Sequence, residues 1–254
     1  RKLGHTLKNL KFASGLMQGK HEGFPLHDGD CYKWMEASCY VYAKNKDPKV
    51  LKDLDDNIAI IAKAQEPDGY IHTLIQIDKI PHFSNRKYHE MYNFGHLFTA
   101  ACIHYRVTGQ RNFLDIAIKA ANLLYQVFMA YNDHYGRFGF NQTQIMGLAE
   151  MYRTTKDERY LRLAEKFIDN RGNYKVEDDS TTIGYPIGDM VQERTPIRES
   201  SEAVGHAALA FYYYAGAEVV AAETGEKSLL DAFDRLWEDV TQKKMYVTGA
   251  VGQA

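Results

Sequence analysis

The feature that most constrains how this chain folds is a pattern of helix starts that occurs four times. Turn-type polar residues precede Leu51, Leu114, Leu161 and Leu230, and apolar residues follow each of these leucines at helical spacing. Within residues 113–124 the apolar side chains trace one stripe and the charged side chains lie on the other side. Each stretch therefore predicts an amphipathic helix with one face in water.

A second kind of segment precedes each amphipathic one. Residues 31–43, 91–105, 145–152 and 203–222 are rich in small and aromatic residues and poor in charge. A helix that is apolar on nearly every side is typical of a position covered by protein all round. Short turns join the two members of each later pair, which makes them antiparallel neighbours. The pattern thus predicts four helical hairpins, each with a covered and a half-exposed helix.

Hairpins of this kind stack as an open solenoid or close into a double ring. The inner helices of a solenoid line a concave surface and are rarely so apolar, so we favour the double ring. The predicted fold is all-α, an (α/α)6 barrel that is incomplete in this chain. We expect residues 1–254 to form the N-terminal two-thirds of one catalytic barrel, with the closing helices and any β-sandwich domains beyond the C-terminus.

Charge and hydropathy narrow the classes of partner. A net charge of −2 carries no electrostatic signature of nucleic-acid or anionic-membrane binding. No apolar run approaches the roughly 20 residues that a membrane-spanning helix needs. We therefore expect neither nucleic acid nor a membrane as a partner. The sequence leaves a homo-oligomer open, and leaves the compartment open between cytoplasm and periplasm.

The three cysteines, Cys31, Cys39 and Cys102, form no CxxC pair and no disulfide framework. Cys31 and Cys39 fall in one predicted helix and lie about 12 Å apart at the usual helical rise, too far for a bridge. We expect all three to be small buried hydrophobic side chains.

Polar clusters stand where the covered helices begin. In a double ring the inner helices run the same way, so their N-terminal ends meet at one mouth. Imidazole, amide and carboxyl groups around an aromatic-lined opening suit a neutral polyol, because each hydroxyl needs both a donor and an acceptor. We therefore predict that a carbohydrate binds here. The predicted binding residues are Asp28, His89, Glu90, Asn141 and His206.

Other interpretations of these residues compete with sugar binding. Asp and Asn at helix starts commonly cap the helix, and a lone His on an apolar helix is commonly a satisfied core residue. For His206, which we place about one turn inside its helix, both interpretations stay open. His89 and Glu90 are followed at the fourth position by Asn93 and not by a second His, so the zinc-protease motif is missing. We expect no metal ligand in these clusters.

Five stretches resemble a known family in order and spacing, over nearly the whole chain. They are HDGDCYKWMEA, QEPDGYIHT, YHEMYNFGHLFTAACIHYRVTG, PIRESSEAVGHA and MYVTGAVG. Residues 89–97 and 198–207 are the most specific. The family is glycoside hydrolase family 127, the beta-L-arabinofuranosidase family with an (α/α)6 barrel.

The resemblance implies hydrolysis of a terminal beta-L-arabinofuranoside, or a closely related furanoside, with retention. It implies a zinc-bound cysteine nucleophile and a glutamate acid/base, all of which it places beyond Ala254. This chain would then hold no catalytic residue and no zinc ligand, but would contribute sugar binding. His89 and His206 match family histidines that contact the arabinose ring. Asn141 stands where characterised members have a third His, which leaves the exact sugar open.

Two other functions remain as alternatives. A sugar epimerase or isomerase on the same toroid would use two histidines as acid and base, but the order of the motifs favours the glycosidase. A non-catalytic sugar-binding protein is the second alternative.

Overall fold

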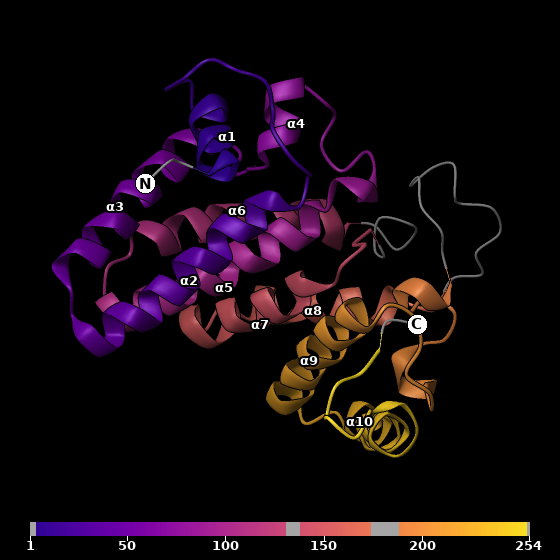
Figure 1. Cartoon of the computed structure of the whole chain (residues 1–254). Coiled ribbons are helices and arrows are strands. Elements are labelled where there is room, and N and C mark those ends of the chain that lie inside the picture. Colours follow the sequence, from indigo (N-terminus) through magenta and orange to yellow (C-terminus); the bar gives the residue numbers. More distant parts are fainter. Residues whose placement is uncertain (1–3, 131–137, 174–187, 253–254) are drawn as a thin grey trace.

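The computed structural model describes residues 4–130, 138–173 and 188–252. Over these residues the only β-type pairing is an isolated bridge between Met245 and Val251. Four antiparallel helix pairs follow one another along the chain (Figure 1). The pairs are α2 (His27–Asn45) with α3 (Pro48–Ala64), α5 (Glu90–Thr108) with α6 (Asn112–Met129), α7 (Thr143–Thr155) with α8 (Glu158–Asn170), and α9 (Ala207–Thr224) with α10 (Lys227–Asp239).

Shorter elements fill the connections between the pairs. The additional elements are α1 (His5–Ala13), α4 (Thr73–Asp78), the 3₁₀ turns η1 (Arg86–Tyr88), η3 (Asp189–Val191) and η4 (Ile197–Glu199), and the π-helical turn η5 (Val240–Lys244).

None of the helices over the described ranges is long and apolar enough to cross a membrane.

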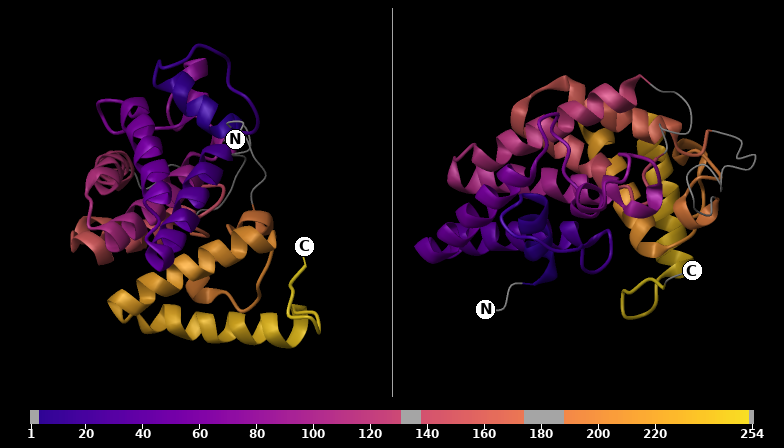
Figure 2. Two further views of the ribbon diagram at one scale, coloured as in Figure 1. Left: turned by 60° about the vertical axis from the view of Figure 1, so that its left-hand side comes forward. Right: turned by 90° about the horizontal axis from the view of Figure 1, so that it is seen from above.

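The first member of each pair lies in an inner layer. Helix α5 packs between α2 and α7, and α7 packs in turn against α9, whereas α3, α6 and α8 form an outer layer (Figure 2). Most residues of α5 are buried, while α6 and α8 bury one face. The predicted alternation of covered and half-exposed helices holds for α5 and α7, whereas α2 and α9 bury only one face over the described residues and are not covered all round. The all-α class is confirmed.

The inner helices α2, α5 and α7 begin side by side. The backbone N–H of Gly29 donates to Asn93 Oδ1 at 2.8 Å, and Thr143 Oγ1 donates to the Tyr92 carbonyl at 3.0 Å. Gly95 lets α5 and α7 approach closely, because a Cβ there would lie 2.4 Å from the Thr143 carbonyl carbon. The three N-terminal ends therefore meet, as the double-ring pattern predicts.

The start of α9 differs from the prediction. The helix begins at Ala207, and His206 occupies the N-cap position instead of lying one turn inside. Gly205 explains the difference, since its φ of +79° is left-handed and a Cβ there would strike the Asp189 carbonyl oxygen. The chain reaches His206 in a turn packed against η3, and only then enters the helix.

A buried ion triad fixes the loops at this end of the fold. The Glu193 carboxylate lies 3.0 Å from the Arg86 guanidinium and 3.2 Å from that of Arg171, and none of the three side chains is exposed. Arg171 also donates to the carbonyls of Val191 and Gly139. One carboxylate thus ties together η1, the end of α8 and the segment after η3.

Replacing Glu193 with Gln should destabilise the fold strongly. The change leaves the Arg86 and Arg171 guanidinium groups buried without their counter-charge, and breaking a buried pair in this way costs about 3–5 kcal/mol. Urea unfolding at pH 7 measures the effect. Glu158→Gln is the matched control, because its pair with Arg162 is exposed on both sides and should change the free energy of unfolding by less than about 0.5 kcal/mol. Equal effects of the two variants would contradict the structural role of the triad.

Candidate sugar site at the helix N-termini

His89 forms the junction between η1 and α5. Its backbone is left-handed, with φ 57° and ψ 30°, and its side chain makes no capping hydrogen bond. The ring packs edge-on against Phe140 at 5.0 Å between centroids and against Tyr92 at 6.3 Å. Burial, aided by the nearby His72, lowers the pKa of His89 to about 4. The imidazole is therefore neutral at pH 7, with one nitrogen as donor and the other as acceptor.

Glu90 follows His89 but points into the protein. Its Oε1 accepts hydrogen bonds from the Tyr70 hydroxyl and from the Phe83 backbone N–H, and its side chain is fully buried. Within the described ranges, Oε2 of Glu90 has no hydrogen-bond partner. Burial raises the pKa of this carboxyl, which His72 and the two hydrogen bonds partly oppose. Glu90 thus anchors the chain between α4 and α5 behind His89.

Asp28 plays a similar part in the first turn of α2. One carboxylate oxygen accepts from the Thr73 backbone N–H and the other from the Thr73 hydroxyl, both at 2.7 Å. The residue is 2% exposed. The carboxylate therefore joins the start of α2 to the start of α4.

Asn141 lies just before α7, beside a small apolar cluster. The cluster contains Phe140, Val191 and Leu209, from three separate segments. Asn141 is buried, and its Oδ1 has no hydrogen-bond partner among the described residues. Because Phe140 also contacts the His89 ring, the structure brings His89 and Asn141 to the same aromatic residue. Leaving a buried amide oxygen without a hydrogen bond costs free energy. The Asn141 Oδ1 could therefore accept a hydrogen bond from a ligand hydroxyl.

His206 lines a cavity of about 690 Å³ beside α9. Its backbone N–H donates to the Met190 carbonyl, and its Nδ1 has no hydrogen-bond partner in the part of the chain that the structure describes. The cavity walls come from the turn before α9, from α9 itself and from the C-terminal segment, including Tyr214 and Tyr246. The volume is in the range of small-molecule sites.

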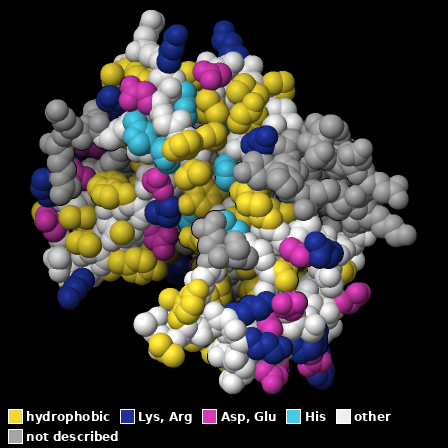
Figure 3. Space-filling model, turned by 45° about the vertical axis from the view of Figure 1, so that its right-hand side comes forward, with side chains coloured by type: hydrophobic (Ala, Val, Ile, Leu, Met, Phe, Trp, Pro, Cys, Tyr) yellow, Lys and Arg dark blue, Asp and Glu magenta, His cyan; other side chains and the backbone are white. Residues whose placement is uncertain are grey.

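Figure 3 shows a face of the molecule on which histidines gather among hydrophobic side chains. Beneath the surface lies His72, the N-cap residue of α4, which sequence analysis did not include among the site residues. It is fully buried, and its Nε2 lies 2.7 Å from the Tyr88 carbonyl. Burial lowers the pKa of His21, which the nearby charge of Asp28 partly opposes. Only the fold shows that His72 approaches Tyr88, because the two residues are 16 positions apart in the sequence.

The cysteines are placed as expected. Cys31, Cys39 and Cys102 are all buried and free, and burial raises the pKa of each to about 12. Cys102 lies against Met151, with 3.5 Å between the sulfurs. Protonated, separate thiols do not fit a zinc-thiolate centre, so no chemical step is assigned to them.

The structure brings together one group that offers metal ligands within the described part of the chain. Glu66, Asp68 and His82 each present a ligand atom, and these atoms lie within 4.8 Å of one another. Sequence analysis did not identify this group. The Glu-x-Asp spacing in a Pro-Asp-Gly turn is visible in the sequence, but the approach of His82 depends on the loop.

The pKa of His89 predicts how stability depends on pH. Below pH 6.5 the His89 side chain takes up a proton in the unfolded chain, whereas in the folded chain it stays unprotonated until about pH 4. Unfolding should therefore become easier as pH falls through this window, by about 1–2 kcal/mol for this residue. In urea unfolding, His89→Asn should reduce the loss of stability between pH 7 and pH 4.5. His96→Gln should do the same, because burial also lowers the pKa of His96 to about 4. An unchanged pH slope in both variants would refute this assignment.

Known proteins resemble this chain in sequence and in fold. A curated non-reducing end beta-L-arabinofuranosidase of Bifidobacterium longum subsp. longum is 32% identical over 266 residues, covering 98% of this chain and 40% of the relative. A solved GH127 beta-L-arabinofuranosidase from Geobacillus stearothermophilus T6 superposes with a TM-score of 0.88 at 35% identity, over 98% of this chain and 41% of that one. A second solved GH127 beta-arabinofuranosidase gives a TM-score of 0.84 at 36% identity, over 97% and 39%.

The chain spans about two-fifths of the length of these relatives. The family model described as "Beta-L-arabinofuranosidase, GH127 catalytic domain" matches residues 2–254. Sequence motifs, fold and family model therefore agree, and the chain belongs to glycoside hydrolase family 127.

Proposed function

We propose that this chain is the sugar-binding part of a family 127 glycosidase that releases a terminal beta-L-arabinofuranosyl or closely related furanosyl residue. The observation that carries the proposal is the neutral His89 imidazole beside Phe140 at the start of α5. An imidazole that offers one donor and one acceptor next to an aromatic ring suits a neutral sugar hydroxyl. Retention, the zinc-bound cysteine nucleophile and the glutamate acid/base belong to the proposal through the family resemblance.

The predicted binding residues divide into two roles in this proposal. His89, Asn141 and His206 have polar atoms that can meet sugar hydroxyls. The carboxylate of Asp28 accepts hydrogen bonds from Thr73, and that of Glu90 accepts them from Tyr70 and Phe83. We propose that these two residues act mainly by holding α4 and the loop before α5 in place. The binding surface would then rest on the inner helices and on the loops before them.

The pKa of His89 favours the glycosidase over an epimerase or isomerase. A general base works best when its pKa lies near the working pH. Burial lowers the pKa of His89 to about 4, which makes it a weak base at neutral pH. The same neutral ring remains a good hydrogen-bonding partner.

A binding experiment with L-arabinofuranose tests the proposal. Isothermal titration of the 254-residue chain should show binding, and His89→Ala and His206→Ala should each weaken it by at least about fivefold, since one hydrogen bond contributes about 1 kcal/mol. His5→Asn is the matched control, because His5 lies on α1 and belongs neither to the Phe140 cluster nor to the cavity at α9. Unchanged affinity in both alanine variants would reject these histidines as sugar contacts.

Hydrolysis provides a separate test. Since the resemblance places the nucleophile and the acid/base after Ala254, we expect the 254-residue chain to bind the sugar without cleaving a beta-L-arabinofuranoside. Release of a chromogenic leaving group would be followed with purified protein. Turnover by this chain, abolished by His89→Ala, would mean that its own residues carry the chemistry and would overturn the assignment of roles.

A further inference from the structure

The turn after α3 presents two carboxylates on one side. The backbone closes on itself, since Glu66 N–H donates to the Tyr70 carbonyl at 2.8 Å and Gly69 N–H donates to the Glu66 carbonyl at 2.9 Å. Asp68 Oδ1 accepts from the Tyr70 N–H at 2.9 Å. Gln65 fastens the turn to α6 by donating to the carbonyls of Gly69 and Ile116. Both acidic side chains are therefore carried on a fixed backbone.

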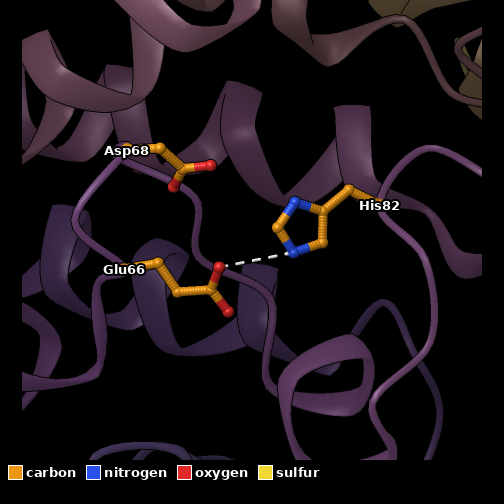
Figure 4. Close-up of side chains that lie close together, drawn as sticks. All are labelled: Glu66, Asp68 and His82. Carbon is orange, nitrogen blue, oxygen red and sulfur yellow. Dashed lines mark ion pairs between the residues drawn. The ribbon is translucent and has the colours of Figure 1, made fainter.

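His82 approaches this turn from the loop that leads to η1 (Figure 4). Its ring stacks on Tyr70 with 3.5 Å between centroids and 4° between planes, and it meets the Phe83 ring edge-on. The stack sets the direction of the imidazole, whose Nε2 lies 3.4 Å from Glu66 Oε2. Glu66 and His82 are each about one-third exposed, so a hydrated ion can reach them.

The spacing of these atoms fits shared ligation better than a direct bond. A charge-assisted hydrogen bond between imidazolium and carboxylate is about 2.7–2.9 Å long, shorter than the 3.4 Å found here. Two ligands on one tetrahedral zinc ion, each at about 2.0–2.1 Å, lie about 3.4 Å apart. Asp68 offers the third ligand atom, and the ligand atoms of the three residues all lie within 4.8 Å of one another.

Charge at this position also favours a cation. Two carboxylates face one imidazole, and within residues 4–130, 138–173 and 188–252 no Lys or Arg forms an ion pair with Glu66 or Asp68. One nitrogen with two carboxylate oxygens is a ligand set that zinc accepts. Calcium needs six to eight oxygen ligands, which this group does not supply.

We propose that Glu66, Asp68 and His82 bind a divalent cation of the zinc class, with water in the remaining position. The ion ties the turn after α3 to the loop before η1. Tyr70 carries the connection further, because one face of its ring stacks on His82 while its hydroxyl donates to Glu90. The cation therefore stabilises the segment that runs from His72, at the start of α4, to His89 and Glu90, at the start of α5.

Metal titration of the chelator-treated 254-residue chain tests the proposal. Zn²⁺ should raise the thermal unfolding temperature and bind with one-to-one stoichiometry in calorimetry, whereas Mg²⁺ and Ca²⁺ at the same concentration should not. His82→Phe keeps a ring to stack on Tyr70 but removes the ligand nitrogen, and should weaken Zn²⁺ binding at least tenfold. Asp68→Asn keeps the Oδ1 acceptor of the turn and should also weaken binding.

Asp56→Asn is the matched control, because Asp56 is an exposed carboxylate on α3 that pairs with Lys52. It should leave the Zn²⁺ affinity unchanged. Absence of Zn²⁺ binding by the folded chain, or equal binding by His82→Phe, would overturn the proposal. Anomalous scattering at the zinc edge from crystals grown with Zn²⁺ gives an independent reading: a peak bonded to all three residues supports the site, and a peak only elsewhere rejects it.

Discussion

The candidate site depends on the buried carboxylate of Glu193 and the two guanidinium groups that face it. Removing three charges from water is costly, and only close geometry with further hydrogen bonds compensates for it. Here Glu193 meets both arginines within 3.3 Å, and Arg171 adds bonds to two backbone carbonyls. Few arrangements of the three loops keep all three buried charges paired, so the triad specifies how these loops meet.

The triad acts on the site through short stretches of chain. Arg86 stands three residues before His89, and Arg171 holds the carbonyl of Gly139, next to Phe140. Arg171 also holds Val191, which packs with Phe140 in the apolar cluster. The charges of the triad thus lie beneath the loops, whereas Asp189, Glu202 and Lys244 stand on the wall of the cavity beside His206. Fixed loops lower the entropy lost when a ligand binds.

Helical periodicity predicted the four hairpins because burial acts on every turn of a helix. Helix α5 has few charged residues and is buried along most of its length, whereas α8 keeps a polar face, so these two kinds of helix could be told apart in the sequence. The start of α9 was misplaced because apolar composition continues through Ala203 and Val204, and the backbone requirement at Gly205 has no periodic signal. The Arg86–Glu193 pair joins residues far apart in the chain, which no local pattern encodes.

The candidate site residues show the same difference between features that have a local sequence pattern and contacts that join distant parts of the chain. His89 and Asn141 were selected because they stand at helix starts, and the structure brings both to Phe140, while their role as sugar contacts stays a prediction. The partners of Asp28 and Glu90 were not predicted, because these contacts join separate parts of the chain: Thr73 begins α4, and Tyr70 and Phe83 lie in the connections before and after that helix. The Glu66–Asp68–His82 group was missed for the same reason: a stacking contact with Tyr70, not a sequence spacing, aims His82 at the turn.

In contrast to the paired charges of the Glu193 triad, burial moves several histidines and cysteines of this chain toward their uncharged forms. It lowers the pKa of His89 and His96 to about 4 and raises that of the three thiols to about 12. Neutral imidazoles exchange hydrogen bonds with hydroxyls without drawing in counter-ions, which suits recognition of an uncharged sugar. The same environment disfavours a thiolate, because an apolar core opposes the charge that a sulfur nucleophile requires. Recognition and nucleophilic attack therefore call for different surroundings, and the neutral imidazoles of the inner helices fit the recognition role that we propose for them.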